Sequence, residues 1–145
     1  MPEQETIERA KEDAREGKSP STQAGEFVRE EMHHVREGKH GARSPQQAIA
    51  IGLSKARRAG VKLSTPTGSP ELRKKAAQDE KASKNPSRKT SARRSRATEA
   101  ALKREPHGSA TKSALSRHAK TAAAKRGKQA RSAAAVKAAR TRRAA

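Results

Sequence analysis

The chain has no cysteine, tryptophan or tyrosine, and Phe27 is its only aromatic residue. Without cysteine it has no disulfide framework, no thiolate metal site and no cysteine nucleophile. The C-terminal half has no aromatic side chain that could stack on exposed bases, and no RRM, KH or OB-fold signature is present. These absences exclude thiol chemistry and argue against sequence-specific recognition of single-stranded nucleic acid.

Large apolar residues are also scarce, because only 30% of the 145 residues are hydrophobic and the mean hydropathy is -1.14. Alanine supplies much of this fraction, and the larger apolar residues lie mostly between Ile7 and Leu72. Ordering the backbone costs about 1–2 kcal/mol per residue, which so little apolar surface cannot offset along the whole chain. We therefore expect one small helical core in the N-terminal half.

No apolar run approaches the ~20 residues that span a membrane. The N-terminus is acidic, which is the opposite of a signal peptide. The lack of cysteine fits a cytosolic compartment. The sequence thus predicts a cytoplasmic protein without a membrane partner.

Acidic residues are scarce in the C-terminal half. The formal net charge is +20, from 35 lysines and arginines against 15 acids. Residues 1–40 carry a net charge of -3, residues 41–70 contain five bases and no acid, and residues 71–145 carry +18. An excess of one sign repels itself and attracts polyanions. The chain is therefore polarised into a near-neutral head and a strongly cationic tail.

Start and stop signals bracket four helical segments and predict a small, all-α fold. The first segment, within residues 1–18, has an apolar face of only Ile7, Ala10 and Ala14, so we expect a weak helix unless it docks. The second and third helices form a predicted hairpin, the head, over residues 19–63. A linker over residues 64–70 precedes a short fourth helix over residues 71–84.

The hairpin is the only core that the sequence predicts. Its second helix is bracketed by Ser44 as N-cap, with Gln47 completing a capping-box pattern, and by Gly60 at a left-handed C-cap position. The apolar face over residues 24–56, which includes Phe27 and Leu53, is exposed in so small a unit. We expect it to self-associate or to bind a protein partner, because covering it adds stability.

Residues 85–145 are dominated by alanine, lysine, arginine, serine and threonine, which is typical of a low-complexity segment. Alanine favours helix, but repulsion between neighbouring cations opposes it and no apolar face is wide enough to pack. The sequence therefore predicts a basic tail that is largely disordered or nascent-helical and that consolidates on a polyanion.

This tail is the principal candidate site, because dense cations bind phosphate backbones by releasing counterions. If about eight phosphates were neutralised, the logarithm of the association constant would fall with a slope near -7 against the logarithm of the salt concentration. The alternative interpretation is a solubilising extension. The predicted phosphate contacts are Arg93, Arg94, Arg96, Lys103, Arg104, Lys112, Arg117, Lys120, Lys125, Arg126, Lys128, Arg131, Lys137, Arg140, Arg142 and Arg143.

A secondary basic patch lies near the end of the third helix and consists of Lys55, Arg57, Arg58 and Lys62. One interpretation is a helix-turn-helix whose recognition helix enters a major groove. Recognition helices contact bases near their N-terminus, however, and cations at a helix C-terminus simply complement the helix dipole. We favour the second interpretation.

Three histidines, His33, His34 and His40, suggest a metal site at first sight. Adjacent helical residues diverge by about 100°, so His33 and His34 do not easily chelate one ion. No cysteine or acid lies at a recognised zinc spacing. We interpret His33 and His34 as a solvated pair, predict no metal and no cofactor, and leave the role of the three histidines open.

Catalytic arrangements are absent from the sequence. It has no glycine-rich phosphate loop, no nucleophile elbow and no pair of carboxylates in an apolar setting. No catalytic residue is therefore predicted, and the protein is expected not to be an enzyme.

Two segments, GEFVREEMHHVREGKHG (residues 25–41) and SPQQAIAIGLSKA (residues 44–56), carry a resemblance. Over residues 21–63 the chain resembles a family of small, basic bacterial proteins in which a helix, an E-G-K-H-G-type turn and an S-x-x-Q-A-I-A-I-x-L-S-x-A helix recur. The tail separately looks like the alanine- and lysine-rich arms of bacterial histone-H1-like proteins. The resemblance implies a DNA-binding role and carries over no catalytic or binding residue.

Together these features predict non-sequence-specific binding of nucleic acid through phosphate contacts, with DNA favoured over RNA. The expected setting is a nucleoid-associated or accessory protein in the cytoplasm and nucleoid. One alternative is an RNA-binding protein or RNA chaperone. Another is a hydrophilic stress-protective protein whose charge serves hydration and which has no specific ligand.

Overall fold

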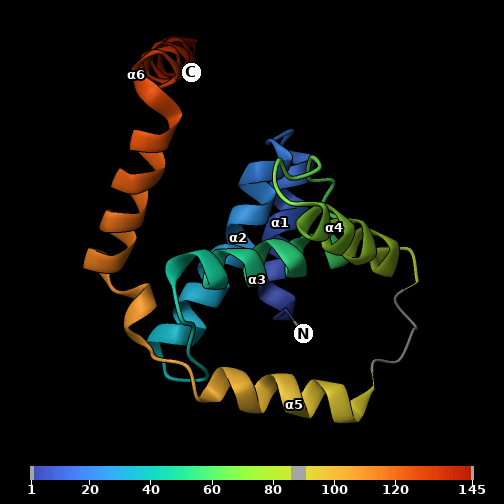
Figure 1. Cartoon of the computed structure of the whole chain (residues 1–145). Coiled ribbons are helices and arrows are strands. Elements are labelled where there is room, and N and C mark those ends of the chain that lie inside the picture. The colour runs from blue at the N-terminus through green and yellow to red at the C-terminus, as the bar shows by residue number, and fades with distance from the viewer. Residues whose placement is uncertain (1, 86–90, 145) are drawn as a thin grey trace. The chain divides into compact units, whose positions relative to one another are not determined.

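The computed structural model describes residues 2–85 and 91–144, and every regular element in these ranges is helical. The all-α class is therefore confirmed for the described residues. They form two compact units, unit 1 (Met1–Ala110) and unit 2 (Thr111–Ala145), which are described separately. The elements in Figure 1 are α1 (Gln4–Arg15), α2 (Pro20–Arg36), α3 (Pro45–Arg58), α4 (Pro70–Ser83), α5 (Ala92–Lys103), the 3-10 turn η1 (Gly108–Ala110) and α6 (Lys112–Ala144).

Serine followed by proline begins α2, α3 and α4, and each serine side chain accepts a hydrogen bond from a backbone N–H of the first turn. This arrangement satisfies a donor that the helix itself leaves unpaired. The N-cap predicted at Ser44 is confirmed, but the Gln47 side chain accepts from the Arg43 N–H at 2.7 Å and does not complete a capping box. Gly60 has a φ of 97°, which confirms the left-handed position after α3.

The core of unit 1 lies where α1, α2 and α3 meet around Phe27, whose residue exposure is 1%. Gly52 lets α3 approach α2 closely, since a Cβ atom there would lie 2.7 Å from Val28 Cα. So small a residue at the crossing brings the two backbones together and lets the few large side chains fill the remaining space. The buried cluster is Ala10, Ala24, Phe27 and Ala56, against which Ile7, Leu53, Val61 and Leu63 pack.

Helix α1 belongs to this core, so the expectation of a core built from the hairpin alone is wrong. Ala10 is buried in the cluster, and the Arg9 Nε atom lies 2.9 Å from the Glu26 carboxylate on α2. The Glu3 N–H, at the N-cap of α1, donates to Glu30 of α2 at 3.1 Å. Polar contacts thus add to the narrow apolar face that made α1 look weak in the sequence.

Helix α4 packs on α3 through one buried acid, Asp79. The Ser54 hydroxyl donates to Asp79 at 2.6 Å, and Arg58 and Lys75 donate to its other oxygen at 2.8 and 3.1 Å. Burial alone would raise the pKa of Asp79, but these three hydrogen bonds hold it below its ordinary value. The carboxylate is therefore charged at neutral pH and joins the two helices.

The end of α5 and the segment after it form backbone hydrogen bonds with the turn between α2 and α3. The Gly41 N–H donates to the Leu102 carbonyl and the Ala42 N–H to the Pro106 carbonyl, both at 2.9 Å. A Cβ atom on Gly41 would collide with the Glu105 carbonyl, so this close backbone approach requires glycine. Unit 1 consequently extends to Ala110 and includes residues that the sequence assigned to the tail.

The prediction that the tail is largely disordered or nascent-helical is wrong, because α5 and α6 are regular helices. Residues 86–90, which also fall in the predicted tail, lie outside the described residues. The sequence explains α6 in retrospect, because the segment is rich in alanine, the residue with the highest helix propensity. Cations still lie three residues apart, as in Arg117 and Lys120 or Lys137 and Arg140, so alanine outweighs their repulsion.

Helix α6 makes up almost all of unit 2 and is interrupted once, at Gly127. There φ is 75° and ψ is 167°, a backbone conformation that is essentially restricted to glycine. Figure 1 shows the ribbon of α6 changing direction toward its C-terminal part. The helix is therefore two consecutive helical rods joined by one glycine.

Candidate functional site

The predicted phosphate-binding residues on α6 are all exposed and cover every side of the helix. They number eleven lysines and arginines among 33 residues, and no acid follows Glu105 in the sequence. At 100° per residue, Lys137, Arg140 and Arg142 already point in three different directions. Unit 2 therefore presents a cationic rod with no acidic residue of its own.

The other predicted phosphate contacts lie on or beside α5. None of the residues of this helix is buried, so Arg93, Arg94 and Arg96 project into solvent. Lys103 forms an exposed ion pair with Glu99 at 2.8 Å, and this pair holds the pKa of Glu99 below its ordinary value. Such exposed pairs contribute little stability and leave the lysine available to another anion.

The secondary basic patch is largely neutralised within unit 1. Lys55 contacts the carboxylates of Glu30 and Glu31 at 3.0 and 2.8 Å, and Arg58 contacts Asp79 at 2.8 Å. Of the four predicted residues, Lys62 is exposed and Arg57 donates to a backbone carbonyl at 3.4 Å. The patch thus offers fewer free cations than its sequence suggests.

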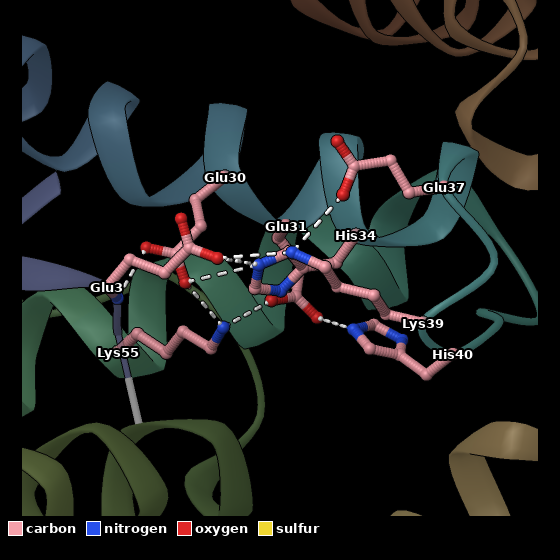
Figure 2. A network of polar contacts seen from close by, with 8 residues as sticks. All are labelled: Glu3, Glu30, Glu31, His34, Glu37, Lys39, His40 and Lys55. Atoms are coloured by element: carbon pink, nitrogen blue, oxygen red, sulfur yellow. Dashed lines mark hydrogen bonds and ion pairs between the residues drawn. The ribbon is translucent and has the colours of Figure 1, made fainter. Parts of the chain in front are cut away.

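A second, unrelated cluster surrounds Glu31 on α2, and Figure 2 shows its eight residues. Only 1% of the Glu31 side chain is exposed. One of its oxygens lies 3.0 Å from His40 Nε2 and the other lies 2.8 Å from Lys55 Nζ, yet neither accepts a hydrogen bond of good geometry. The cluster consists of Glu3, Glu30, Glu31, His34, Glu37, Lys39, His40 and Lys55.

Two of the three histidines meet in this cluster. His34 and His40 expose 12% and 14% of their side chains, and their ring centroids are 6.0 Å apart. His33 is exposed. The interpretation of His33 and His34 as a solvated pair is therefore correct for His33 and wrong for His34.

Burial and charge act in opposite directions on the ionisable groups around Glu31. Burial alone would lower the pKa of Lys55, but the Glu31 and Glu30 carboxylates beside it raise the pKa above its ordinary value. Burial likewise would raise the pKa of Glu30, while hydrogen bonds from Lys55, Thr6 and the Glu3 N–H lower it. The pKa of Glu3 is lowered by hydrogen bonds from His34 and Lys39. The lysines and these acids therefore stay charged.

The sequence analysis did not single out Glu31, because it tested His33 with His34 as a metal-binding pair and not His34 with His40. Glu31 and His34 are spaced i, i+3 and share a face of α2, and the E-G-K-H-G turn brings His40 back to that face. The spacing was visible in the sequence, whereas the return of His40 depends on how the turn folds. The candidate ligand atoms of Glu31, His34 and His40 lie within 4.8 Å of one another.

Comparison with known proteins gives no match: no family model, no curated protein and no solved structure is significantly similar to this chain. The resemblance to small basic bacterial proteins therefore stays a prediction. Among the described helices, none combines the length and apolar character that crossing a membrane requires.

Proposed function

We propose that the protein binds nucleic acid, DNA in preference to RNA, through phosphate contacts from α5 and α6 and without reading base sequence. The observation that carries the proposal is the cationic rod of unit 2, eleven exposed lysines and arginines with no acid among them. Such a surface attracts polyanions, and nucleic acid is the most abundant polyanion in a cell. A role in the nucleoid is the setting that this chemistry favours.

The spacing of charge along α6 suits a duplex. A helix rises about 1.5 Å per residue, so one cation per three residues corresponds to about 4.5 Å of helix axis, against about one phosphate per 1.7 Å of B-DNA. The duplex therefore offers more phosphates than α6 has cations. Because the cations surround the rod, several orientations on the duplex are equivalent, and a rod that touches two duplexes would bridge them.

The same surface is poorly suited to reading bases. Base recognition needs a few side chains held in fixed positions by a packed scaffold. Along α6 only Ala114 is buried, and its long cationic side chains extend from an otherwise exposed helix. We therefore expect binding that depends on salt and hardly on sequence.

A salt titration of full-length protein on a labelled duplex tests this function. If about eight phosphates are neutralised, the slope of log K against log salt is near -7 and the affinity falls by about four decades between 50 and 200 mM salt. Gel mobility shift at several salt concentrations measures the slope. An affinity that is the same at both ends of this range would refute a phosphate-based mechanism.

A charge-matched pair of variants assigns the binding to unit 2. Replacing Arg140, Arg142 and Arg143 by glutamine should reduce the slope by about 0.9 for each of the three that contacts a phosphate, and so by about 2.7 at most. The control replaces three exposed cations of unit 1 by glutamine and removes the same charge. The control residues are Lys11, Arg15 and Arg73. An equal change in both variants would mean that net charge, and not α6, determines binding.

Competition separates DNA from the remaining alternatives. Structured RNA, added in equal amounts of nucleotide, should displace the labelled duplex less effectively than unlabelled duplex does. Stronger displacement by RNA would favour an RNA-binding protein or chaperone. Absence of any shift at physiological salt would favour the hydrophilic, ligand-free alternative.

A further inference from the structure

His40 lies between two hydrogen-bond acceptors. Its Nδ1 atom is 2.9 Å from the Gly41 carbonyl oxygen, and its Nε2 atom is 3.0 Å from a Glu31 carboxylate oxygen. A neutral imidazole carries only one N–H, so it can donate to one of these oxygens and must present a lone pair to the other. If the single proton lies on Nδ1 and is donated to the Gly41 carbonyl, the Nε2 lone pair faces the Glu31 carboxylate, and a metal ion between them would satisfy both.

His34 is held in a complementary way. Its Nε2 atom is 3.0 Å from a Glu3 carboxylate oxygen, which orients the ring and leaves Nδ1 as the second coordinating atom. Figure 2 shows the His34 ring between Glu3 on one side and Glu31 on the other. A histidine that donates one N–H to a carboxylate or a backbone carbonyl while its other nitrogen faces inward is the usual arrangement of a metal ligand. Both histidines have such a partner, Glu3 for His34 and the Gly41 carbonyl for His40.

The charges of the cluster also leave room for a divalent cation. Its eight residues contain four glutamates and two lysines, so with neutral histidines the net charge is -2. Glu31 is the most buried acid of the group, and Lys55 pairs with only one of its oxygens, at 2.8 Å. The other oxygen faces His40 at 3.0 Å, so a cation coordinated there would add a second positive partner to a buried carboxylate.

We propose that Glu31, His34 and His40 form a binding site for one divalent transition-metal ion. The ligand atoms are one Glu31 oxygen, His34 Nδ1 and His40 Nε2, which lie within 4.8 Å of one another. Metal–ligand bonds of about 2.0–2.2 Å require these atoms to move somewhat closer together around the ion. Lys55 holds the other Glu31 oxygen, so that Glu31 binds the ion through one oxygen only.

The ligand set selects the class of metal. Two imidazole nitrogens and one carboxylate suit zinc, nickel, copper or ferrous iron, whereas magnesium and calcium prefer oxygen ligands alone. A polar depression of about 230 Å³, lined by Glu3, Glu30 and His34 among others, borders the cluster and gives an ion access from solvent. The three ligands lie on α2 and the turn that follows it, and none is among the residues of α5 and α6 that are proposed to bind nucleic acid.

Isothermal titration of the full-length protein with Zn²⁺ tests the proposal. The wild type should bind about one zinc ion per chain at this site. His40→Gln keeps an amide that can donate to Glu31, so unit 1 should stay folded. Zinc affinity should nevertheless fall by more than about 100-fold, because the loss of a ligand costs more than the loss of a residue that only hydrogen-bonds a ligand. Glu3→Gln, which contacts His34 but neither of the other two proposed ligands, should weaken binding by roughly 10-fold. Circular dichroism checks that each variant is folded.

The matched control is His33→Gln, which removes the exposed neighbour of His34 and should leave zinc affinity unchanged. Nitrogen NMR of the histidine rings provides a second readout, in which zinc should shift Nδ1 of His34 and Nε2 of His40. Magnesium should produce neither heat nor shift. The proposal is overturned if the wild type binds no zinc or if His33→Gln weakens binding as much as His40→Gln does. It is also overturned if zinc shifts nitrogens other than Nδ1 of His34 and Nε2 of His40.

Discussion

The two units of the chain handle positive charge in opposite ways. Unit 1 contains 24 of the 35 lysines and arginines but also all 15 acids, and its most buried acids, Glu30, Glu31 and Asp79, contact lysine or arginine side chains. Unit 2 contains the remaining eleven cations and no acid. The cations that face the buried acids of unit 1 stabilise helix packing, whereas those of α5 and of unit 2 remain available to an external anion. Net charge alone would not distinguish the two roles.

The units also differ in what makes them helical. Unit 1 depends on tertiary contacts, because its helices bury a small apolar cluster and are linked by ion pairs. Unit 2 has one long helix with a single buried residue, Ala114, and must depend on intrinsic propensity. The comparison teaches that two helical units of one chain can respond to mutation by different mechanisms, and three substitutions test this.

Phe27→Ala should have the largest effect, because it removes the only aromatic residue from the core of unit 1. Truncation of a buried phenylalanine costs about 3–5 kcal/mol, which is a large part of the stability of a small domain. We expect the free energy of unfolding of unit 1 to fall by this amount in urea titrations followed by circular dichroism. The helical signal of α6 should persist after unit 1 has unfolded. Loss of all helix in one transition would show that unit 2 depends on the packing of unit 1.

Asp79→Asn should have an intermediate effect. It removes the carboxylate that Arg58 and Lys75 share, so that these two cations, like those of unit 2, lack an acidic partner. Hydrogen bonds to a charged group contribute about 1.5–3 kcal/mol, so the free energy of unfolding should fall by about that much at pH 7. Thermal or urea unfolding measures the difference, and Glu80→Gln, which removes an exposed acid of the same helix, is the matched control.

The pH dependence of Asp79→Asn provides a stricter test. The pKa of Asp79 is lower in the folded protein than its ordinary value of 3.8. The stabilisation is therefore complete only well above this ordinary value, from about pH 5, and is lost as the pH falls through the lower, folded-state pKa. The difference in stability between wild type and variant should be constant near neutrality and should narrow in acid. A difference that grows in acid would contradict the assigned role of the carboxylate.

The sequence predicted the parts of the fold that depend on local signals. Helix starts at serine–proline pairs and the stop at Gly60 need only neighbouring residues, and the structure has them. What it could not predict depends on distant partners: the docking of α1 through Glu3 and Arg9, and the return of residues 102–110 to the turn at Gly41. No local pattern encodes a backbone hydrogen bond between Gly41 and Leu102.

The candidate sites differ in the same way. The cationic tail is a property of composition, so its residues could be named from the sequence. Its helical state was misjudged because repulsion between the cations was given more weight than the helix propensity of alanine. The cluster around Glu31 was missed because His40 reaches it only when the turn after α2 folds back. Lys55 was assigned to a surface patch because its acidic partners, Glu30 and Glu31, lie on another helix and cannot be recognised from neighbouring residues.

Gly127→Ala should have the smallest effect and should change unit 2 alone. Gly127 adopts a φ of 75°, which alanine rarely adopts, and no atom lies within 4 Å of the position that a Cβ atom would occupy. Alanine in the observed conformation is therefore strained by its backbone and not by a contact. Alanine is about 1 kcal/mol more favourable than glycine within a helix, so the two rods should join into one and the helical signal should rise. Circular dichroism measures this rise, and the unfolding of unit 1 should be unchanged. A reduced signal would mean that the break at Gly127 is enforced by contacts, and that α6 is not governed by propensity alone.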